Sequence, residues 1–273
     1  MTARKQSTRG ALGALAHAFR LGCSETWEQR SALLGTFVNY AVILSLWANL
    51  YRQLHPESLA RASLGYAQVV WYLALTELVA LAIGYVFRQI QDEILDGSVT
   101  ALLVRPVGYV ALTGAQELGR MTAKIAVLAA PGAALAYWLT GTAPFGLAVV
   151  PAAGVSVVAG AANLLAMQVL VGLSTAWFGT ARPVFFIAQK LMFVLGGLIL
   201  PLDAYPAVLV KIAWLTPFPA MLYAPASIAL DPTWPHVAAM LAVQAFWLGV
   251  AWLAIVTASA AFERRFITGG LAA

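Results

Sequence analysis

The chain has 273 residues, of which 62% are apolar and only 10% are charged. Ordinary soluble domains carry about 25% charged residues, so this composition excludes a water-soluble globular protein. The mean hydropathy of +0.82 and the long uncharged runs indicate a lipid bilayer as the surrounding solvent. The net charge of +5 does not indicate nucleic acid binding, because basic residues in a membrane protein mainly set its orientation. We therefore expect an all-α protein that crosses the bilayer several times.

Residues 1–30 precede the first long apolar run and predict a helix that lies in the inner membrane interface. Leu15, Phe19 and Trp27 recur at helical spacing, with polar residues between them. The single cysteine, Cys23, cannot form an intramolecular disulfide. An anchoring role and a mechanical role for this helix both stay open.

Six apolar segments follow, each near the length of about 20 residues that a helix needs to cross the hydrocarbon core. They cover residues 31–51, 66–88, 119–140, 147–177, 184–202 and 236–261. With the N-terminus inside, only Arg52, Arg61 and Lys211 lie outside, and the other thirteen of the 16 basic residues lie on the inner side. We predict one domain in the cell (inner) membrane, with a six-helix region over 31–261, a tail over 262–273 and both termini cytoplasmic.

The connection between the second and third segments carries helix-ending signals and clustered charge. Residues 88–96 predict a helix that leaves the membrane, Gly97 suits the left-handed position after it, and Ser98 can cap a second short helix. Arg105 precedes Pro106 and so ends that second helix. The expected apolar face holds Ile90, Ile94 and Leu95, and the expected exposed carboxylates are Asp92, Glu93 and Asp96. This predicts a compact helix-turn-helix.

The stretch that follows the fifth segment is apolar yet interrupted by prolines. Pro201, Pro206 and Pro217 all fall within residues 196–221. A continuous span cannot pass these prolines, and a water-exposed loop would be less apolar. We expect short broken helices that dip into the outer leaflet, at the outer end of a translocation path.

Glu77 lies near the middle of the second segment, and Lys190 lies in the fifth. An unpaired charge at that depth costs about 2.5 kcal/mol or more. At 1.5 Å per residue the two differ in depth by only about 6 Å. Either Glu77 faces the pathway with Lys190 balancing its charge, or Lys190 extends to the interface and Glu77 bonds a neighbouring helix. Asn39, Asn163, Gln168 and Gln244 could contact cargo, but hydrogen bonds between helices are the expected role for each.

These features, in this order, resemble the ABC-2 type family of transporter permeases, the membrane subunits of a class of ATP-driven exporters. The inner stretch 94–107 is similar to the family's acidic residue, glycine, small polar residue, two leucines and basic-Pro pair. The outer stretch from Gly197 to Pro217 is similar to the family's short helices between spans five and six. The resemblance covers nearly the whole chain.

The resemblance implies that the inner loop includes a coupling helix that docks into a separate cytosolic ATPase subunit. The residues that would make this contact are Gln89, Asp92, Glu93, Ile94, Leu95, Asp96, Gly97 and Arg105. It also implies a second permease copy or homologue that completes the pathway, with Pro201, Pro206 and Pro217 at an outer gate. The sequence contains no G-x-x-x-x-G-K-[ST] motif, so we expect no cofactor in this chain and place ATP and Mg²⁺ on the partner subunit. The expected cargo is a small amphipathic or hydrophobic molecule moved outward.

Two other classes of protein stay open. An ion-coupled secondary transporter would use Glu77, although the sequence shows no internal repeat to support it. An integral membrane enzyme would need catalytic groups gathered at one depth, whereas the three histidines are scattered along the chain. We therefore expect a transport subunit rather than an enzyme.

Overall fold

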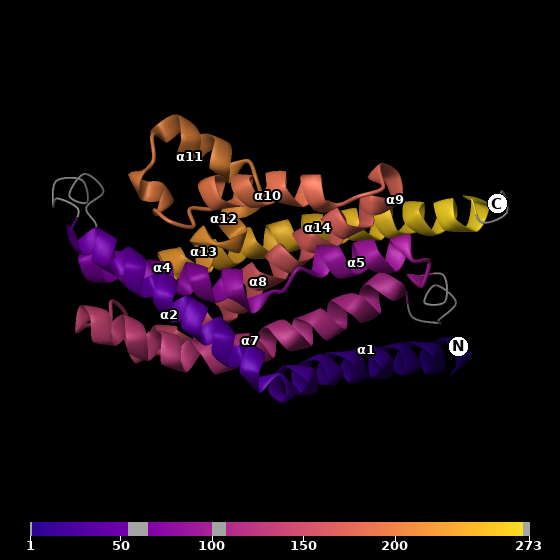
Figure 1. The fold of residues 1–273 in the computed structure, drawn as a ribbon, viewed down its shortest axis with the longest axis horizontal. Coiled ribbons are helices and arrows are strands. Elements are labelled where there is room, and N and C mark those ends of the chain that lie inside the picture. Colours follow the sequence, from indigo (N-terminus) through magenta and orange to yellow (C-terminus); the bar gives the residue numbers. More distant parts are fainter. Residues whose placement is uncertain (1, 54–64, 100–107, 270–273) are drawn as a thin grey trace.

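The computed structural model describes residues 2–53, 65–99 and 108–269, and every regular element within these ranges is a helix. The long helices run roughly along the longest axis of the molecule, and both ends of the chain lie at the same end of the bundle (Figure 1). The long helices are α1 (Thr2–Glu28), α2 (Arg30–Gln53), α4 (Tyr66–Ala82), α7 (Tyr109–Thr140), α8 (Val150–Leu173) and α14 (Trp234–Gly269). The shorter elements are α5 (Val86–Leu95), η1 (Leu147–Val149), α9 (Thr175–Phe178), α10 (Arg182–Leu195), η2 (Leu202–Ala204), α11 (Ala207–Trp214), α12 (Phe218–Met221) and α13 (Tyr223–Ser227).

Among the described residues, five stretches are long and apolar enough to cross a membrane. They are Arg30–Gln53, Tyr66–Leu95, Tyr109–Thr140, Leu147–Phe178 and Trp234–Arg264. The predicted segment 184–202 differs, because its helix α10 has only 14 residues. That is about 21 Å, against a hydrocarbon core of about 30 Å. α10 gives way to a turn in which Gly197 has φ 68°, a conformation that favours glycine. The prediction of a long continuous helix over 184–202 was therefore wrong.

The second apolar stretch is broken. α4 ends at Ala82 and α5 begins at Val86, with Gly84 in the irregular segment between them. The sequence predicted one continuous helix here. The backbone N–H of Phe87, in the first turn of α5, donates to Oε1 of Gln168 on α8 at 3.4 Å. A side chain of α8 thus supplies an acceptor that the interrupted helix lacks.

The helix α1 packs along the first half of α7, with the two backbones in direct contact (Figure 1). A Cβ atom added at Gly22 would lie 2.0 Å from the carbonyl oxygen of Gln116. One added at Gly119 would lie 2.0 Å from the carbonyl oxygen of Phe19. Only glycine therefore fits at these two positions, and they set the distance between the helices.

Polar contacts join the same two helices. Arg120 on α7 forms an ion pair with Glu25 on α1 at 2.6 Å and a second with Glu117 on its own helix. The Gln116 side chain donates to the Glu25 carboxylate at 2.9 Å. The N-terminal helix predicted from the sequence is therefore attached to the bundle along α7.

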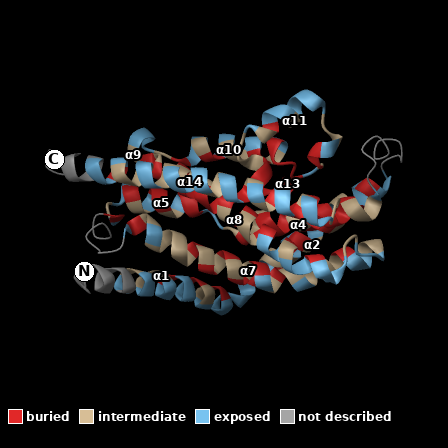
Figure 2. Cartoon of the chain, turned by 180° about the vertical axis from the view of Figure 1, so that it is seen from behind, coloured by how far each residue is buried: buried red, intermediate tan, exposed pale blue. Residues whose placement is uncertain are grey.

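The centre of the bundle is formed by α4, α8 and α13, and α2 and α14 cover it (Figure 2). Apolar side chains of α14 such as Phe246 and Leu253 are exposed, as expected of a helix that faces lipid. Gln244 of α14 donates to the carbonyl oxygen of Ser156 at 2.8 Å, and Asn163 donates to the carbonyl oxygen of Gln244 at 3.2 Å. The expected hydrogen bonds between helices are thus confirmed for Gln168, Asn163 and Gln244.

The prediction of short broken helices in the outer stretch is confirmed. Pro201, Pro206 and Pro217 are the residues that precede η2, α11 and α12 respectively. α12 and α13 are buried against the bundle, whereas α11 exposes apolar side chains such as Val208. Each of these prolines is the N-cap residue, and proline suits a helix boundary because it has no N–H to donate to the preceding turn and its ring clashes inside a helix.

Candidate functional site

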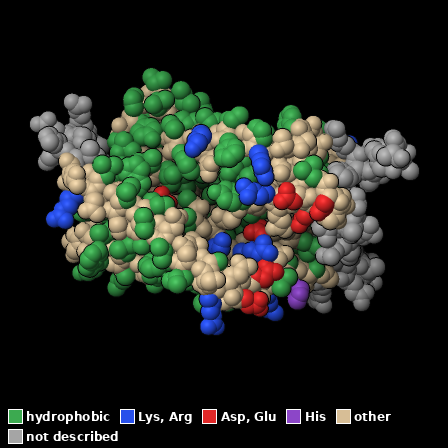
Figure 3. Space-filling model, in the orientation of Figure 1, with side chains coloured by type: hydrophobic (Ala, Val, Ile, Leu, Met, Phe, Trp, Pro, Cys, Tyr) green, Lys and Arg blue, Asp and Glu red, His purple; other side chains and the backbone are tan. Residues whose placement is uncertain are grey.

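A cavity of about 770 Å³ lies between α2, α4, α7, α8 and α10. Its walls include the aromatic residues Trp47, Tyr85, Phe185 and Phe193 and the polar residues Thr36, Asn39, Glu77, Lys124, Gln168 and Gln189. Pockets for small ligands have volumes of about 300–1,000 Å³ and combine apolar walls with a few polar groups. The space-filling view shows a hollow in the face formed by α2 and α10, with charged side chains gathered toward the end that holds the termini (Figure 3).

Glu77 is buried, with 7% of its surface exposed, and lines this cavity. No hydrogen bond or ion pair among the described residues holds its carboxylate. Ile83, Gly84 and Tyr85, which separate α4 from α5, line the same cavity. Irregular backbone at membrane depth is tolerated where it lines a cavity, and it leaves polar backbone groups available to a ligand. The carboxylate and the helix break thus belong to one site.

The predicted pairing of Glu77 with Lys190 is not formed in this structure. The Lys190 side chain is exposed, with its Nζ atom 5.6 Å from the centre of the Phe193 ring. Lys124 of α7 lines the cavity together with Glu77 instead. Sequence reasoning counted Lys124 only as an inner basic residue. Lys124 lies one helical turn further into the predicted membrane span than Arg120, and this position could have indicated that it lines a cavity.

The helix α5, which lies toward the end of the bundle that holds the chain termini (Figure 1), has a different exposed face from the one expected. Ile90 and Ile94 are 1% and 8% exposed and pack in a core cluster with Leu165 and Val169 of α8. Leu95 is 60% exposed. Because successive residues on a helix are turned by about 100°, Leu95 cannot share the face that Ile90 and Ile94 present to α8. The prediction that all three face one way was therefore wrong for Leu95.

The three acidic residues at the end of α5 differ in their exposure to solvent. Glu93 is half-buried rather than exposed, because its carboxylate accepts hydrogen bonds from the Tyr109 hydroxyl and, at 3.0 Å, from Gln89. Asp92 and Asp96 are exposed, as predicted. Hydrogen bonds from the Ser98 side chain and backbone lower the pKa of Asp96 below its usual value. A charged carboxylate therefore stands beside the exposed Leu95.

The turn after α5 follows the sequence prediction where the structure describes it. Gly97 has φ 79°, the left-handed conformation expected there. The Ser98 backbone N–H donates to Oδ1 of Asp96 at 2.8 Å. The predicted second short helix and Arg105 lie almost entirely outside the described residues.

The outer short helices are attached to α4, the helix that carries Glu77. The Tyr72 hydroxyl donates to the carbonyl oxygen of Gly197, and Thr76 Oγ1 donates to the carbonyl oxygen of Leu198 at 3.2 Å. Further out, the Tyr223 hydroxyl donates to the Asp203 carboxylate at 2.9 Å. The segment with Gly197 and Leu198 therefore contacts the part of α4 that directly precedes Glu77.

One polar cluster has the composition of a catalytic triad. Ser227 Oγ lies 2.9 Å from His236 Nε2, and His236 Nδ1 lies 3.9 Å from the Asp231 carboxylate. Ser227 is fully buried and its hydroxyl also donates to the Ala224 carbonyl at 3.0 Å, so a substrate cannot reach it. Asp231 accepts from the backbone N–H of Thr233, which is a turn-forming role. This cluster therefore does not favour an enzyme.

Five stretches among the described residues that are long and apolar enough to span a membrane, and a polar-lined cavity at a helix break, are typical of a membrane transport protein. The family model described as ABC-2 family transporter protein matches residues 37–264. This is most of the chain, which therefore belongs to the ABC-2 transporter family. No curated protein matches the sequence.

Proposed function

We propose that this chain is the permease subunit of an ATP-driven exporter and forms half of its translocation pathway. The observation that carries the proposal is the cavity of about 770 Å³, in which Glu77 and Lys124 face a break in a spanning helix. A discontinuous helix beside polar groups is typical of transport sites near the middle of the bilayer. A separate cytosolic ATPase and a second permease copy or homologue complete the exporter.

In this proposal the chain crosses the inner membrane six times, with both termini cytoplasmic. The membrane crossing between α8 and α14 is made by α10, which is about 21 Å long. The buried helices α12 and α13 extend this crossing across the rest of the bilayer. Pro201, Pro206 and Pro217 start the short helices that would form the outer gate.

The proposed cargo is a small amphipathic or hydrophobic molecule that leaves the cell. Trp47, Phe185 and Phe193 offer it apolar surface, while Glu77 and Lys124 offer one charge of each sign. Lys124 takes the place in this proposal that sequence analysis assigned to Lys190.

The absence of a phosphate-binding loop leads to the first prediction. The purified chain should hydrolyse no ATP, and hydrolysis should appear only when its cytosolic partner is co-purified. Phosphate release would be measured with the chain alone, the partner alone and the complex in lipid. Turnover by a clean preparation of the single chain would contradict the assignment as a permease.

The exposure of Leu95 allows a sharper test of docking than the sequence alone allowed. Leu95→Ser should preserve folding and membrane insertion but weaken binding of the ATPase by about tenfold, since a buried interface leucine contributes about 1.5 kcal/mol or more. Ile94→Ser is unsuitable because Ile94 is buried in the core of this chain. Binding would be measured by co-purification and by titration of the ATPase.

Leu147→Ser is the matched control, because Leu147 is 89% exposed but lies in η1, at the end of the bundle away from α5. It should leave ATPase binding unchanged. Equal binding by Leu95→Ser and the wild type would show that this turn is not the docking site.

The alternative, an ion-coupled secondary transporter, also uses Glu77. It differs from the ATP-driven exporter in the energy source that drives transport. Transport that follows ATP in the complex and ignores an imposed proton or sodium gradient supports the exporter. Transport that follows the gradient without any ATPase would replace it.

A further inference from the structure

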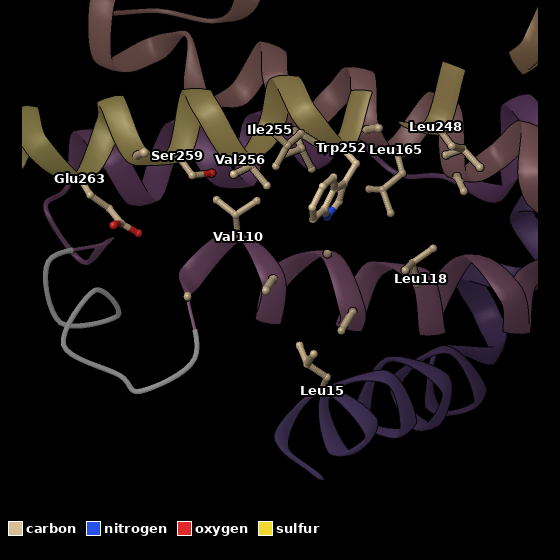
Figure 4. Close-up of a pocket in the computed structure, with 18 residues that line it drawn as sticks. Leu15, Val110, Leu118, Leu165, Leu248, Trp252, Ile255, Val256, Ser259 and Glu263 are labelled. Carbon is tan, nitrogen blue, oxygen red and sulfur yellow. The ribbon is translucent and has the colours of Figure 1, made fainter. Parts of the chain in front are cut away.

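A second cavity, of about 600 Å³, lies between α14 and α7, with α8 behind it and α1 at its edge (Figure 4). It shares no lining residue with the cavity that contains Glu77. Its walls are almost wholly apolar and include Leu118, Leu165, Leu248 and Trp252. The Trp252 ring extends into the space between α14 and α7 (Figure 4). This lining excludes a strongly polar, water-soluble ligand.

The cavity has the length and depth of one membrane leaflet. Along α14 its lining runs from Leu248 to Glu263, which is about 22 Å of helix. One leaflet with its headgroup layer is about 20–22 Å thick. If Trp234 marks the outer interface, Leu248 lies about 21 Å below it, near the midplane, and Glu263 about 43 Å below it, at the level of the inner headgroups.

Apart from the indole N–H of Trp252, the polar side chains of the cavity lie at one end, the end nearest the chain termini. The hydroxyl of Ser259 is buried and has no hydrogen-bond partner among the described residues. It points into the cavity, beside Val110 of α7 (Figure 4). Glu263 lines the same end, and its side chain is exposed. The first turn of α7, from Gly108, also lies there and presents the positive end of the helix dipole.

From this arrangement we propose that the cavity binds one phospholipid of the inner leaflet whose headgroup carries a primary ammonium. The acyl chain lies along Trp252 and Leu248, and the Ser259 hydroxyl donates to an ester oxygen. The ammonium pairs with the Glu263 carboxylate, and the phosphate lies toward the start of α7. An anionic headgroup without an ammonium is repelled by Glu263, and a choline headgroup cannot donate a hydrogen bond to it.

The test uses native mass spectrometry of the delipidated full-length chain in detergent. Phosphatidylethanolamine, phosphatidylcholine and phosphatidylglycerol with identical acyl chains are titrated separately. One phosphatidylethanolamine should bind per chain, and it should bind more tightly than the other two lipids. Glu263→Gln should reduce the preference over phosphatidylcholine by about three- to tenfold, the range expected for a partly exposed charged hydrogen bond.

A pair of glycine variants tests the cavity itself. Gly114 lines it, and a Cβ atom there would meet nothing within 4 Å, so the backbone accepts a side chain at this position and Gly114→Leu should place its bulk in the cavity. This variant should weaken lipid binding by about tenfold or more, because the side chain takes the volume of the acyl chain. Gly154 on α8 is equally open but lies outside the cavity, so Gly154→Leu should bind lipid normally.

Three results would each overturn the proposal. They are unchanged lipid binding by Gly114→Leu, no headgroup preference in the wild type, and lipid adducts that occur on monomers but never on dimers. The last would identify this groove as a contact between two copies. Should Gly114→Leu fail to fold, Ser259→Ala decides the same question, because it should weaken binding of all phospholipids alike and leave the headgroup preference intact.

Discussion

Glu77→Gln should reduce transport by the complete exporter by about tenfold or more, because a charged hydrogen bond to a ligand contributes about 1.5–3 kcal/mol. The change keeps the shape of the side chain and removes its charge. The carboxylate has no partner among the described residues, so folding should not suffer. Transport would be measured in vesicles that contain the complex, and the yield of folded complex would be measured in parallel.

The two lysines provide the control for this prediction. Lys124→Gln in the Glu77→Gln background should partly restore transport, because the proposal makes Lys124 the opposite charge that acts together with Glu77 on the cargo in this cavity. Lys190→Gln should not, because its ammonium lies over the Phe193 ring. Normal transport by Glu77→Gln would remove the carboxylate from the mechanism. Rescue by Lys190→Gln alone would restore the pairing predicted from the sequence.

Gly119→Ala should lower the free energy of unfolding by about 1–3 kcal/mol or more, since overpacking in a tight contact has this cost. The added Cβ would lie 2.0 Å from the Phe19 carbonyl oxygen, so α1 must move away from α7. The Cys23 thiol, which donates to the Gly119 carbonyl at 3.3 Å, reports this movement. Maleimide labelling of Cys23, the only cysteine, should therefore become faster.

Gly114→Ala on the same helix is the matched control. A Cβ atom there meets no neighbour, and alanine favours a helix over glycine by about 0.5–1 kcal/mol. This variant should be as stable as the wild type or more so, with unchanged labelling. Equal stability of the two variants would contradict the close contact between α1 and α7.

Features that depend on local backbone chemistry were predictable from the sequence. Gly97 adopts the predicted left-handed conformation, and Pro201, Pro206 and Pro217 each precede a short helix. Glycine and proline restrict the chain through their own covalent structure, so these effects need no knowledge of neighbouring helices. The locations of the five long apolar stretches followed from a different local property, the length of each uncharged apolar run.

The direction in which a side chain points from its helix was not predictable from the sequence. The depths of Glu77, Lys124 and Lys190 follow from residue counting, but the direction in which each points is decided by packing. Leu95 is exposed because Ile90 and Ile94 already occupy the face that meets α8. The break before α5 had only the isolated Gly84 as a local signal, and such a glycine is compatible with an unbroken helix.

The break between α4 and α5 also determines which helices a displacement of α5 would reach. α5 is joined to α8, where Ile90 would lie 2.8 Å from a Cβ atom at Gly172, and the Gln91 side chain accepts from the backbone N–H of Ala181 at the start of α10. α4 is instead held at its outer end, where Tyr72 bonds Gly197. In the proposed exporter we expect this segment to act as a hinge and α5, which is about 15 Å long, to act as a lever. Docking at Leu95 in that exporter would therefore be passed by α5 to the α8 and α10 walls of the cavity.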